Sequence, residues 1–190
     1  TQPSEFNDLK ADLKAFPVPA ETTSRVHRGF KNEVDELWPM VRPDVEKVTK
    51  NLWFCGHSLG AAMATIMAAR CSYSYYMPDP VQLYTFGSPR VGWHKYVKGM
   101  KVDHIRWQNN NDIVTRVPLM VMGYKHHGHL MYIRHDGSVD DDGKWSPIGR
   151  FIDRMKGMWG GIKQLKVDNF SDHAMAEYIP HLERWKEKDV

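Results

Sequence analysis

Short apolar runs alternate along the chain with stretches in which apolar residues recur at helical spacing. The runs have the length and composition of strands, and they cover residues 52–55, 81–86, 104–108 and 131–135. The stretches with helical preference or periodicity cover residues 32–50, 61–70, 148–166 and 172–188. Strands separated by helices predict an α/β protein with a mixed or mostly parallel sheet.

Breaks in these patterns refine the prediction. Pro39 and Pro43 are expected to bend the first helix, and Pro180 the last one. The run Leu52 to Cys55 is apolar without alternation, which predicts a buried strand. The acidic segment 136–143 closes the fourth strand, and we expect it to be a solvated turn.

The first 16 residues form an amphipathic pattern of their own. One helical face carries four apolar side chains, Phe6, Leu9, Leu13 and Phe16. Two interpretations are open for residues 1–16. The helix packs on the core as an ordinary surface helix, or it is a mobile lid that covers a hydrophobic cleft and opens on a lipid surface.

A Gly-x-Ser-x-Gly pentapeptide, Gly56-His57-Ser58-Leu59-Gly60, stands between the first strand and an alanine-rich helix. A tight turn of this kind strains the backbone of its serine, so side-chain bulk must be absent at Gly56 and Gly60. Free N–H groups at the helix N-terminus favour negative charge, and the Leu59 amide is a candidate oxyanion donor. The pattern predicts that Ser58 is a nucleophile.

A nucleophilic serine needs a base, usually histidine, and a carboxylate that holds the base in one tautomer. In hydrolases with this turn the chain order is Ser, then Asp or Glu, then His. Asp112 directly follows the third strand, where a loop beside the turn is expected. Asp79 lies in the wrong connection, and the acidic residues of 136–142 are expected to be solvated. The spacing favours Asp112, although an Asp at a strand end is also a common turn former.

Six histidines follow Asp112, namely His126, His127, His129, His135, His173 and His181. His173 comes after the last predicted strand, at the start of the final helix, and the spacing favours it as the base over His126 and His127. The cluster at 126–129 suggests zinc, but no Cys or Glu accompanies it at ligand spacing. We therefore expect no metal.

Composition narrows the class of protein. The 190 residues fit a single domain, 42% of them are hydrophobic and 26% charged, and the net charge is +3. Basic residues are scattered, which argues against a nucleic-acid partner, and no apolar stretch is long enough to cross a bilayer. Cys55 and Cys71 lie on the first strand and at the far end of the next helix, so free buried thiols are expected.

Segments spread over residues 26–182 match the motifs of one known family in the same order. They are Val26-His27-Arg28-Gly29-Phe30, the pentapeptide, Thr85 to Gly92, Asn111 to Val114 with Val117-Pro118, Gly123 to Gly128 with Tyr132-Ile133, and Asp172 to Met175 with Tyr178-Ile179. They resemble the class 3 lipases, α/β-hydrolases that include secreted fungal triacylglycerol lipases and bacterial relatives.

The resemblance implies a role for each candidate residue. Ser58 is the nucleophile, Asp112 the orienting acid and His173 the base. The histidines at 126, 127 and 129 take structural roles, and the pentapeptide's own His57 is not the base. A carboxylic ester hydrolase without a cofactor is expected, most simply a triacylglycerol lipase acting at a lipid–water interface. A phospholipase, a galactolipase, a short-chain esterase and a non-catalytic hydrolase scaffold stay open.

The chain also departs from the family pattern. Trp93 stands where the family usually has Asn. The family's sheet has two or three further strands ahead of the position that matches Thr1, so we expect an N-terminally truncated α/β-hydrolase. The resemblance makes Thr1 the second oxyanion donor. A companion chain or a dimer partner is one way to supply the strands, and the resemblance favours a secreted protein without settling the compartment.

Overall fold

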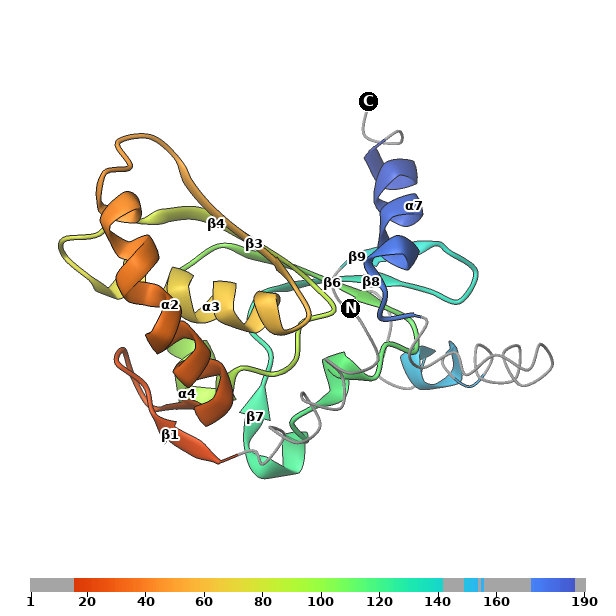
Figure 1. Cartoon of the computed structure of the whole chain (residues 1–190). Coiled ribbons are helices and arrows are strands. Elements are labelled where there is room, and N and C mark those ends of the chain that lie inside the picture. The colour runs from red at the N-terminus through yellow and green to blue at the C-terminus, as the bar shows by residue number, and fades with distance from the viewer. Residues whose placement is uncertain (1–15, 142–148, 154, 156–171, 187–190) are drawn as a thin grey trace.

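The structure is a computed structural model, and it describes residues 16–141, 149–153, 155 and 172–186. A five-stranded sheet runs through the middle of it (Figure 1). The strands are β3 (Leu52–His57), β4 (Pro80–Phe86), β6 (His104–Asn109), β8 (His129–Ile133) and β9 (Val139–Asp141). Their order is β3-β4-β6-β8-β9, with the first four parallel and β9 antiparallel to β8. The predicted α/β architecture and mostly parallel sheet are confirmed.

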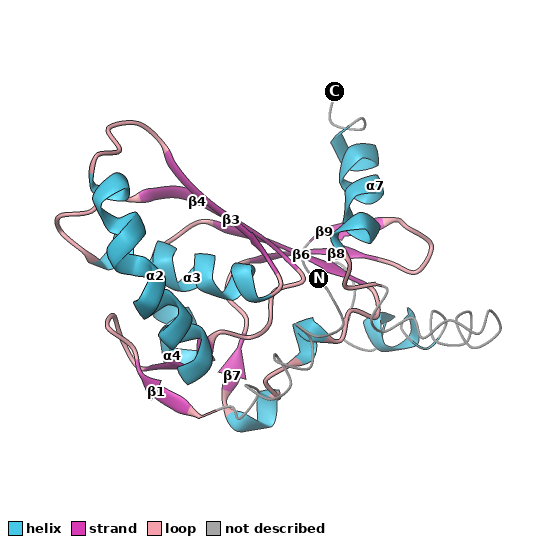
Figure 2. Cartoon of the chain, viewed as in Figure 1, coloured by secondary structure: helices cyan, strands magenta, loops and turns pink. Residues whose placement is uncertain are grey.

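Helices cover the two faces of this sheet at different ends (Figure 2). The alanine-rich α3 (Leu59–Tyr73) packs on β3 and β4 because its small side chains let the helix approach the strands, and α2 (Arg28–Glu46) packs against α3. On the opposite face, α7 (Met175–Lys186) packs on β6, β8 and β9. That contact forms an apolar cluster around Trp107, Met131 and Tyr178.

A second, antiparallel sheet of very short strands lies beside the first. It consists of β1 (Pro17–Pro19), β2 (Arg25–His27), β5 (Gly92–Trp93) and β7 (Tyr124–Lys125). The connections carry α4 (His94–Gly99) and two 3₁₀ turns, η1 (Val114–Arg116) and η2 (Met120–Met122). Strands of two or three residues give too little periodicity for sequence patterns to reveal them.

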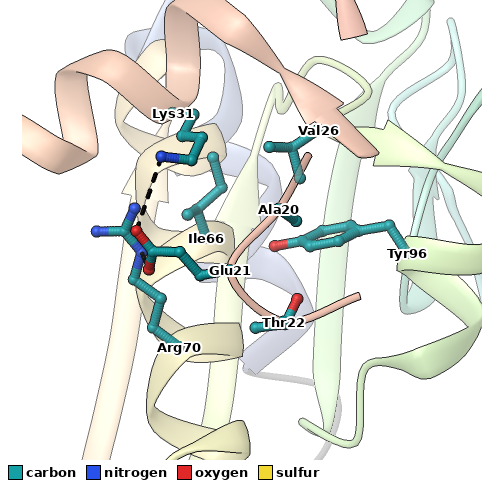
Figure 3. A pocket seen from close by; sticks show the side chains of 8 residues that line it. All are labelled: Ala20, Glu21, Thr22, Val26, Lys31, Ile66, Arg70 and Tyr96. Atoms are coloured by element: carbon teal, nitrogen blue, oxygen red, sulfur yellow. Dashed lines mark ion pairs between the residues drawn. The ribbon is translucent and has the colours of Figure 1, made fainter. Parts of the chain in front are cut away.

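Arg70 on α3 ties the segment before β2 to the helical layer. Its guanidinium forms ion pairs with Glu21 and Asp35, and Lys31 pairs with the same two carboxylates. Burial alone would raise the pKa of Asp35, but hydrogen bonds from Lys31 and Arg70 outweigh it and hold that pKa below its ordinary value. The cavity beside this network (Figure 3) has a volume of about 10 Å³, too small for more than one water molecule.

The predicted burial of the first strand is wrong on one face. Phe54 packs against the core, but Trp53 is 56% exposed and the thiol-bearing Cys55 is exposed as well. The reason is topological: β3 ends the five-stranded sheet, α3 covers only one of its faces, and the other carries Trp53 stacked on Tyr84. Both cysteines are free, and only Cys71 is buried. The predicted companion chain or dimer partner stays a prediction.

The ends of several elements also differ from their predicted bounds. The first helix begins at Arg28, and Pro39 and Pro43 lie inside it. The last helix begins at Met175 and contains Pro180. The expected acidic turn contains β9, and Asp140 there is buried beside Arg134. Residues 149–153 are helical, while most of the predicted helix 148–166 lies outside the described residues.

The predicted lid helix, residues 1–16, falls almost wholly outside the described residues. Only Phe16 is described, with its ring exposed and the Arg28 guanidinium 5.3 Å from the ring centre. The lid therefore stays a prediction. In the part of the chain that the structure describes, none of the helices combines the length and apolar character needed to cross a membrane.

Candidate active site

Ser58 sits at the junction between β3 and α3 in a strained backbone conformation. Its φ of 57° and ψ of −127° lie where non-glycine residues are rare. A Cβ on Gly56 would lie 2.4 Å from the carbonyl oxygen of Gly60, so only glycine fits there. The matching expectation for Gly60 is wrong, because a Cβ at that position would meet nothing within 4 Å. The turn therefore requires glycine at position 56, because the Gly60 backbone lies against it, but it does not require glycine at position 60.

The turn places Ser58 directly before the start of α3. The Ser58 amide donates to the Phe86 carbonyl at 3.0 Å, which ties the turn to the end of β4. Leu59 is the first residue of α3, and first-turn amides of a helix have no carbonyl one turn earlier to bind. Together with the helix dipole, this makes the space beside Ser58 and the Leu59 amide favourable for negative charge.

Three residues far apart in sequence meet at the carboxyl edge of the parallel sheet. Ser58 follows β3, Asp112 follows β6, and His173 precedes α7. His173 Nε2 lies 2.8 Å from Ser58 Oγ, and His173 Nδ1 lies 3.0 Å from each carboxylate oxygen of Asp112. All three residues are buried. The structure thus brings together the three side chains that the sequence analysis selected.

The Asp112 carboxylate is held from several sides. The Val114 amide donates to Oδ1 at 2.9 Å, and the Tyr178 hydroxyl donates to Oδ2 at 2.6 Å. Tyr178 also accepts the Asn109 amide at 3.0 Å. Burial, followed by the charge of Asp112, raises the pKa of Tyr178 well above its ordinary value, so this hydroxyl keeps its proton and acts as a donor.

His173 is fixed through its backbone as well as its ring. His57 Nε2–H donates to the His173 carbonyl at 2.7 Å, and the two imidazoles stack with centroids 4.7 Å apart. Burial lowers the pKa of His57, which favours the neutral ring in that contact. His57 therefore supports His173.

Gly87, at the end of β4, leaves room for the Asp112–His173 contact. Its φ is +58°, and a Cβ there would lie 2.7 Å from Asp112 Oδ2 and 3.0 Å from His173 Nδ1. The sequence patterns did not predict these contacts for Gly87, Tyr178 or His57. For Gly87, the available sequence signal was a glycine directly after an apolar strand. Tyr178 and His57 contact residues that are 66 and 116 positions away, and such contacts leave no local signal in the sequence.

The remaining histidine candidates lie in other contacts. His126 Nε2–H donates to the Thr115 carbonyl at 2.7 Å, and burial lowers the pKa of His126 well below its ordinary value. His127 stacks on His104, and His129 pairs with Asp141. Within the described residues, no three His, Cys, Asp or Glu side chains are grouped so as to hold a metal ion. Thr1, the predicted second oxyanion donor, lies outside those residues.

A buried Ser–His–Asp line of this kind can do nucleophilic acyl chemistry. The histidine ring is placed to take the serine proton, and the carboxylate is placed to hold the ring in the tautomer that accepts it. The Leu59 amide lies on the same turn as Ser58, where an oxyanion donor for attack by that hydroxyl would have to lie.

Comparison with known proteins places this arrangement in context. The family model for Lipase (class 3) matches residues 2–122. Toxin TseL of Vibrio cholerae is 38% identical over 215 aligned residues, which cover 90% of this chain and 33% of the toxin. A secreted mono- and diacylglycerol lipase of Fusarium solani is 37% identical over 111 residues, 53% of this chain and 32% of that lipase.

Solved structures of lipases are also similar to this chain. A triacylglycerol lipase whose catalytic centre is formed by a serine protease triad is 25% identical, with a TM-score of 0.65. The match covers 78% of this chain and 63% of that one. This chain spans about a third of the length of the two curated relatives.

Proposed function

This chain belongs to the class 3 lipase family, and from that premise we propose that it is a carboxylic ester hydrolase that uses Ser58, His173 and Asp112 as a catalytic triad. The observation that carries the proposal is the buried line from Ser58 Oγ through both ring nitrogens of His173 to the Asp112 carboxylate. A serine protease triad in a triacylglycerol lipase of the same fold supports it.

The reaction begins with proton transfer from Ser58 to His173. As Ser58 Oγ attacks the ester carbonyl, its proton passes to His173 Nε2, and Asp112 stabilises the imidazolium through Nδ1–H. His173 then gives the proton to the departing alcohol, which leaves an acyl group on Ser58. Water, activated by the same ring, attacks the acyl-enzyme and releases the carboxylic acid.

The negative oxygen that forms in each step needs donors. The Leu59 amide at the start of α3 is the first donor, and we assign Thr1 as the second on the family resemblance. One such donor stabilises the transition state by about 3 kcal/mol. The chain would therefore be slower, but still active, with either donor misplaced.

Acylglycerols are the proposed substrates. The mono- and diacylglycerol lipase of Fusarium solani and the solved triacylglycerol lipase support this class. The exposed apolar side chains around the turn at 119–122 are consistent with a substrate presented at a lipid surface. The secreted relative supports a location outside the cell.

The substrate class is tested by raising tributyrin from dissolved monomers to an emulsion. We expect hydrolysis in both ranges, with a jump in rate once the emulsion forms, because a lipase acts at the interface. Hydrolysis without the jump would favour a short-chain esterase. Faster release of fatty acid from phosphatidylcholine or galactolipid than from tributyrin would identify those lipids as the preferred substrates. No hydrolysis of any ester by the folded chain would leave only a non-catalytic scaffold.

Tyr178 is assigned as a positioning residue that acts through Asp112. Tyr178→Phe is expected to lower kcat about tenfold with little change in KM, because a hydrogen bond to a charged group contributes roughly 1.5–3 kcal/mol. The measurement is kcat and KM for p-nitrophenyl butyrate, together with the thermal unfolding midpoint.

Tyr132→Phe is the matched control for that variant. Tyr132 is equally buried, and its hydroxyl also donates to a carboxylate, that of Asp153, at 3.0 Å. Both variants should lose stability, but only Tyr178→Phe should lose kcat. An equal fall in kcat in both would show that Tyr178 acts through stability alone.

A further inference from the structure

An exposed apolar turn projects from the molecule after the Asp112 loop. Four consecutive large apolar side chains form it, Leu119, Met120, Val121 and Met122, and Val121 is 90% exposed. The turn contains η2 and lies at the lower end of the view in Figure 1, next to β7. Scattered exposed apolar residues are ordinary, but four in succession on one short turn mark a contact surface.

The base of this apolar turn, residues 119–122, is held firmly. The Arg90 guanidinium donates to the carbonyl oxygens of Arg116 and, at 2.8 Å, Pro118. The Arg90 amide donates to Val117 at 2.8 Å. On the far side, the Gly123 amide closes the turn on Met120. These hydrogen bonds hold the turn at both ends, and its apolar side chains are exposed.

Basic side chains lie on the second sheet, whose strand β7 directly follows the apolar turn. The strands β2, β5 and β7 of the second sheet, and η2, lie in three segments that contain no Asp or Glu. These segments are residues 22–32, 80–102 and 113–135. Trp93 lies against Gly123, and the Arg25 guanidinium lies 5.3 Å from the centre of the Trp93 ring. Lys125 follows the turn on β7. Apolar side chains flanked by cations, with no carboxylate in these segments, complement a lipid surface that has apolar acyl chains and anionic headgroups.

We propose that the apolar turn 119–122 docks this chain on an anionic lipid surface by inserting its side chains among the acyl chains while nearby Arg and Lys side chains meet the headgroups. The proposal rests on the proposed function, since docking there brings the triad to its substrate. Leu119 follows Asp112 by seven residues, so the start of the turn lies within about 25 Å of Asp112.

A lipid surface fits these features better than a protein partner does. Four side chains on one turn offer at most a few hundred Å², whereas a stable protein interface buries roughly 800 Å² on each partner. Insertion into a membrane interface needs only a small apolar area, provided that electrostatic attraction assists it.

The test measures vesicle binding without turnover. In a Ser58→Ala background, the chain is sedimented with vesicles of phosphatidylglycerol or of phosphatidylcholine alone. The double variant Met120→Asp/Val121→Asp is compared with Met40→Asp/Val81→Asp, which makes the same changes at exposed sites on α2 and β4. Equal thermal unfolding midpoints establish that both double variants fold.

The parent and the Met40/Val81 control should bind phosphatidylglycerol vesicles, and the turn variant about tenfold or more weakly. Binding to phosphatidylcholine should be weaker, and 1 M NaCl should weaken the phosphatidylglycerol binding, because the Debye length falls to about 3 Å. Equal binding by the two double variants, or no binding by the parent, would overturn the proposal. Self-association of the parent that the turn variant alone loses, without vesicle binding, would assign the turn to a protein contact.

Failure of this proposal is distinguishable from failure of the proposed function. Fluorophosphonate labelling of the unmutated chain in solution, without vesicles, reports on Ser58 alone. A chain that labels but does not bind vesicles would reject only the docking surface. A chain that binds through the apolar turn but never labels would reject only the ester hydrolase.

Discussion

Replacing Ser58 by alanine is expected to lower kcat for p-nitrophenyl butyrate by up to about 10⁶-fold, because members of a catalytic triad act as a unit. The variant keeps the Leu59 amide and the binding surface, so some rate above the uncatalysed reaction should remain. The measurement is the initial rate at saturating substrate, with the thermal unfolding midpoint as a check on the fold.

Ser72→Ala is the control for this change. Ser72 lies near the other end of α3, where its hydroxyl donates to the Ala69 carbonyl at 3.0 Å. Its loss should leave kcat at the parental value. Hydrolysis by Ser58→Ala at the parental rate would mean that Ser58 is not the nucleophile.

Replacing His173 by alanine should cost nearly as much as replacing Ser58. Without the ring, nothing takes the Ser58 proton, and Asp112 loses the group that it orients. The double variant Ser58→Ala/His173→Ala should be no slower than either single variant, since each already removes the nucleophilic step. Rates of the three variants on p-nitrophenyl butyrate provide the measurement.

His127→Ala tests the main rival base from the sequence. Its ring stacks on His104, so the variant should lose some stability and keep most of its kcat. A reversed result, with His127→Ala inactive and His173→Ala active, would move the base to the 126–129 cluster.

Local patterns made the turn around Ser58 predictable. The strand, the glycine at 56 and the alanine-rich helix are all contiguous in sequence, so the turn could be inferred without tertiary information. Spacing alone left Asp112 and His173 as favoured candidates, and the family resemblance selected them. Their meeting depends on parallel strands ending at one edge, which is a property of the sheet as a whole.

The features that sequence reasoning missed depend on contacts between distant segments. Trp53 looks like a core residue because it is apolar, and only the position of β3 at the end of the sheet leaves it exposed. The support of His173 by His57 and of Asp112 by Tyr178 joins segments 116 and 66 residues apart. Asp140 looks solvated in an acidic run, yet the pairing of β9 with β8 buries it.

The central claim, an activated serine at the end of β3, is tested most directly by treating the folded chain with a fluorophosphonate and locating the adduct by peptide mass spectrometry. A single adduct on Ser58, absent after His173→Ala, is the predicted result. A folded chain that takes up no reagent, or one that carries the adduct on Ser88 or another serine, would contradict the claim.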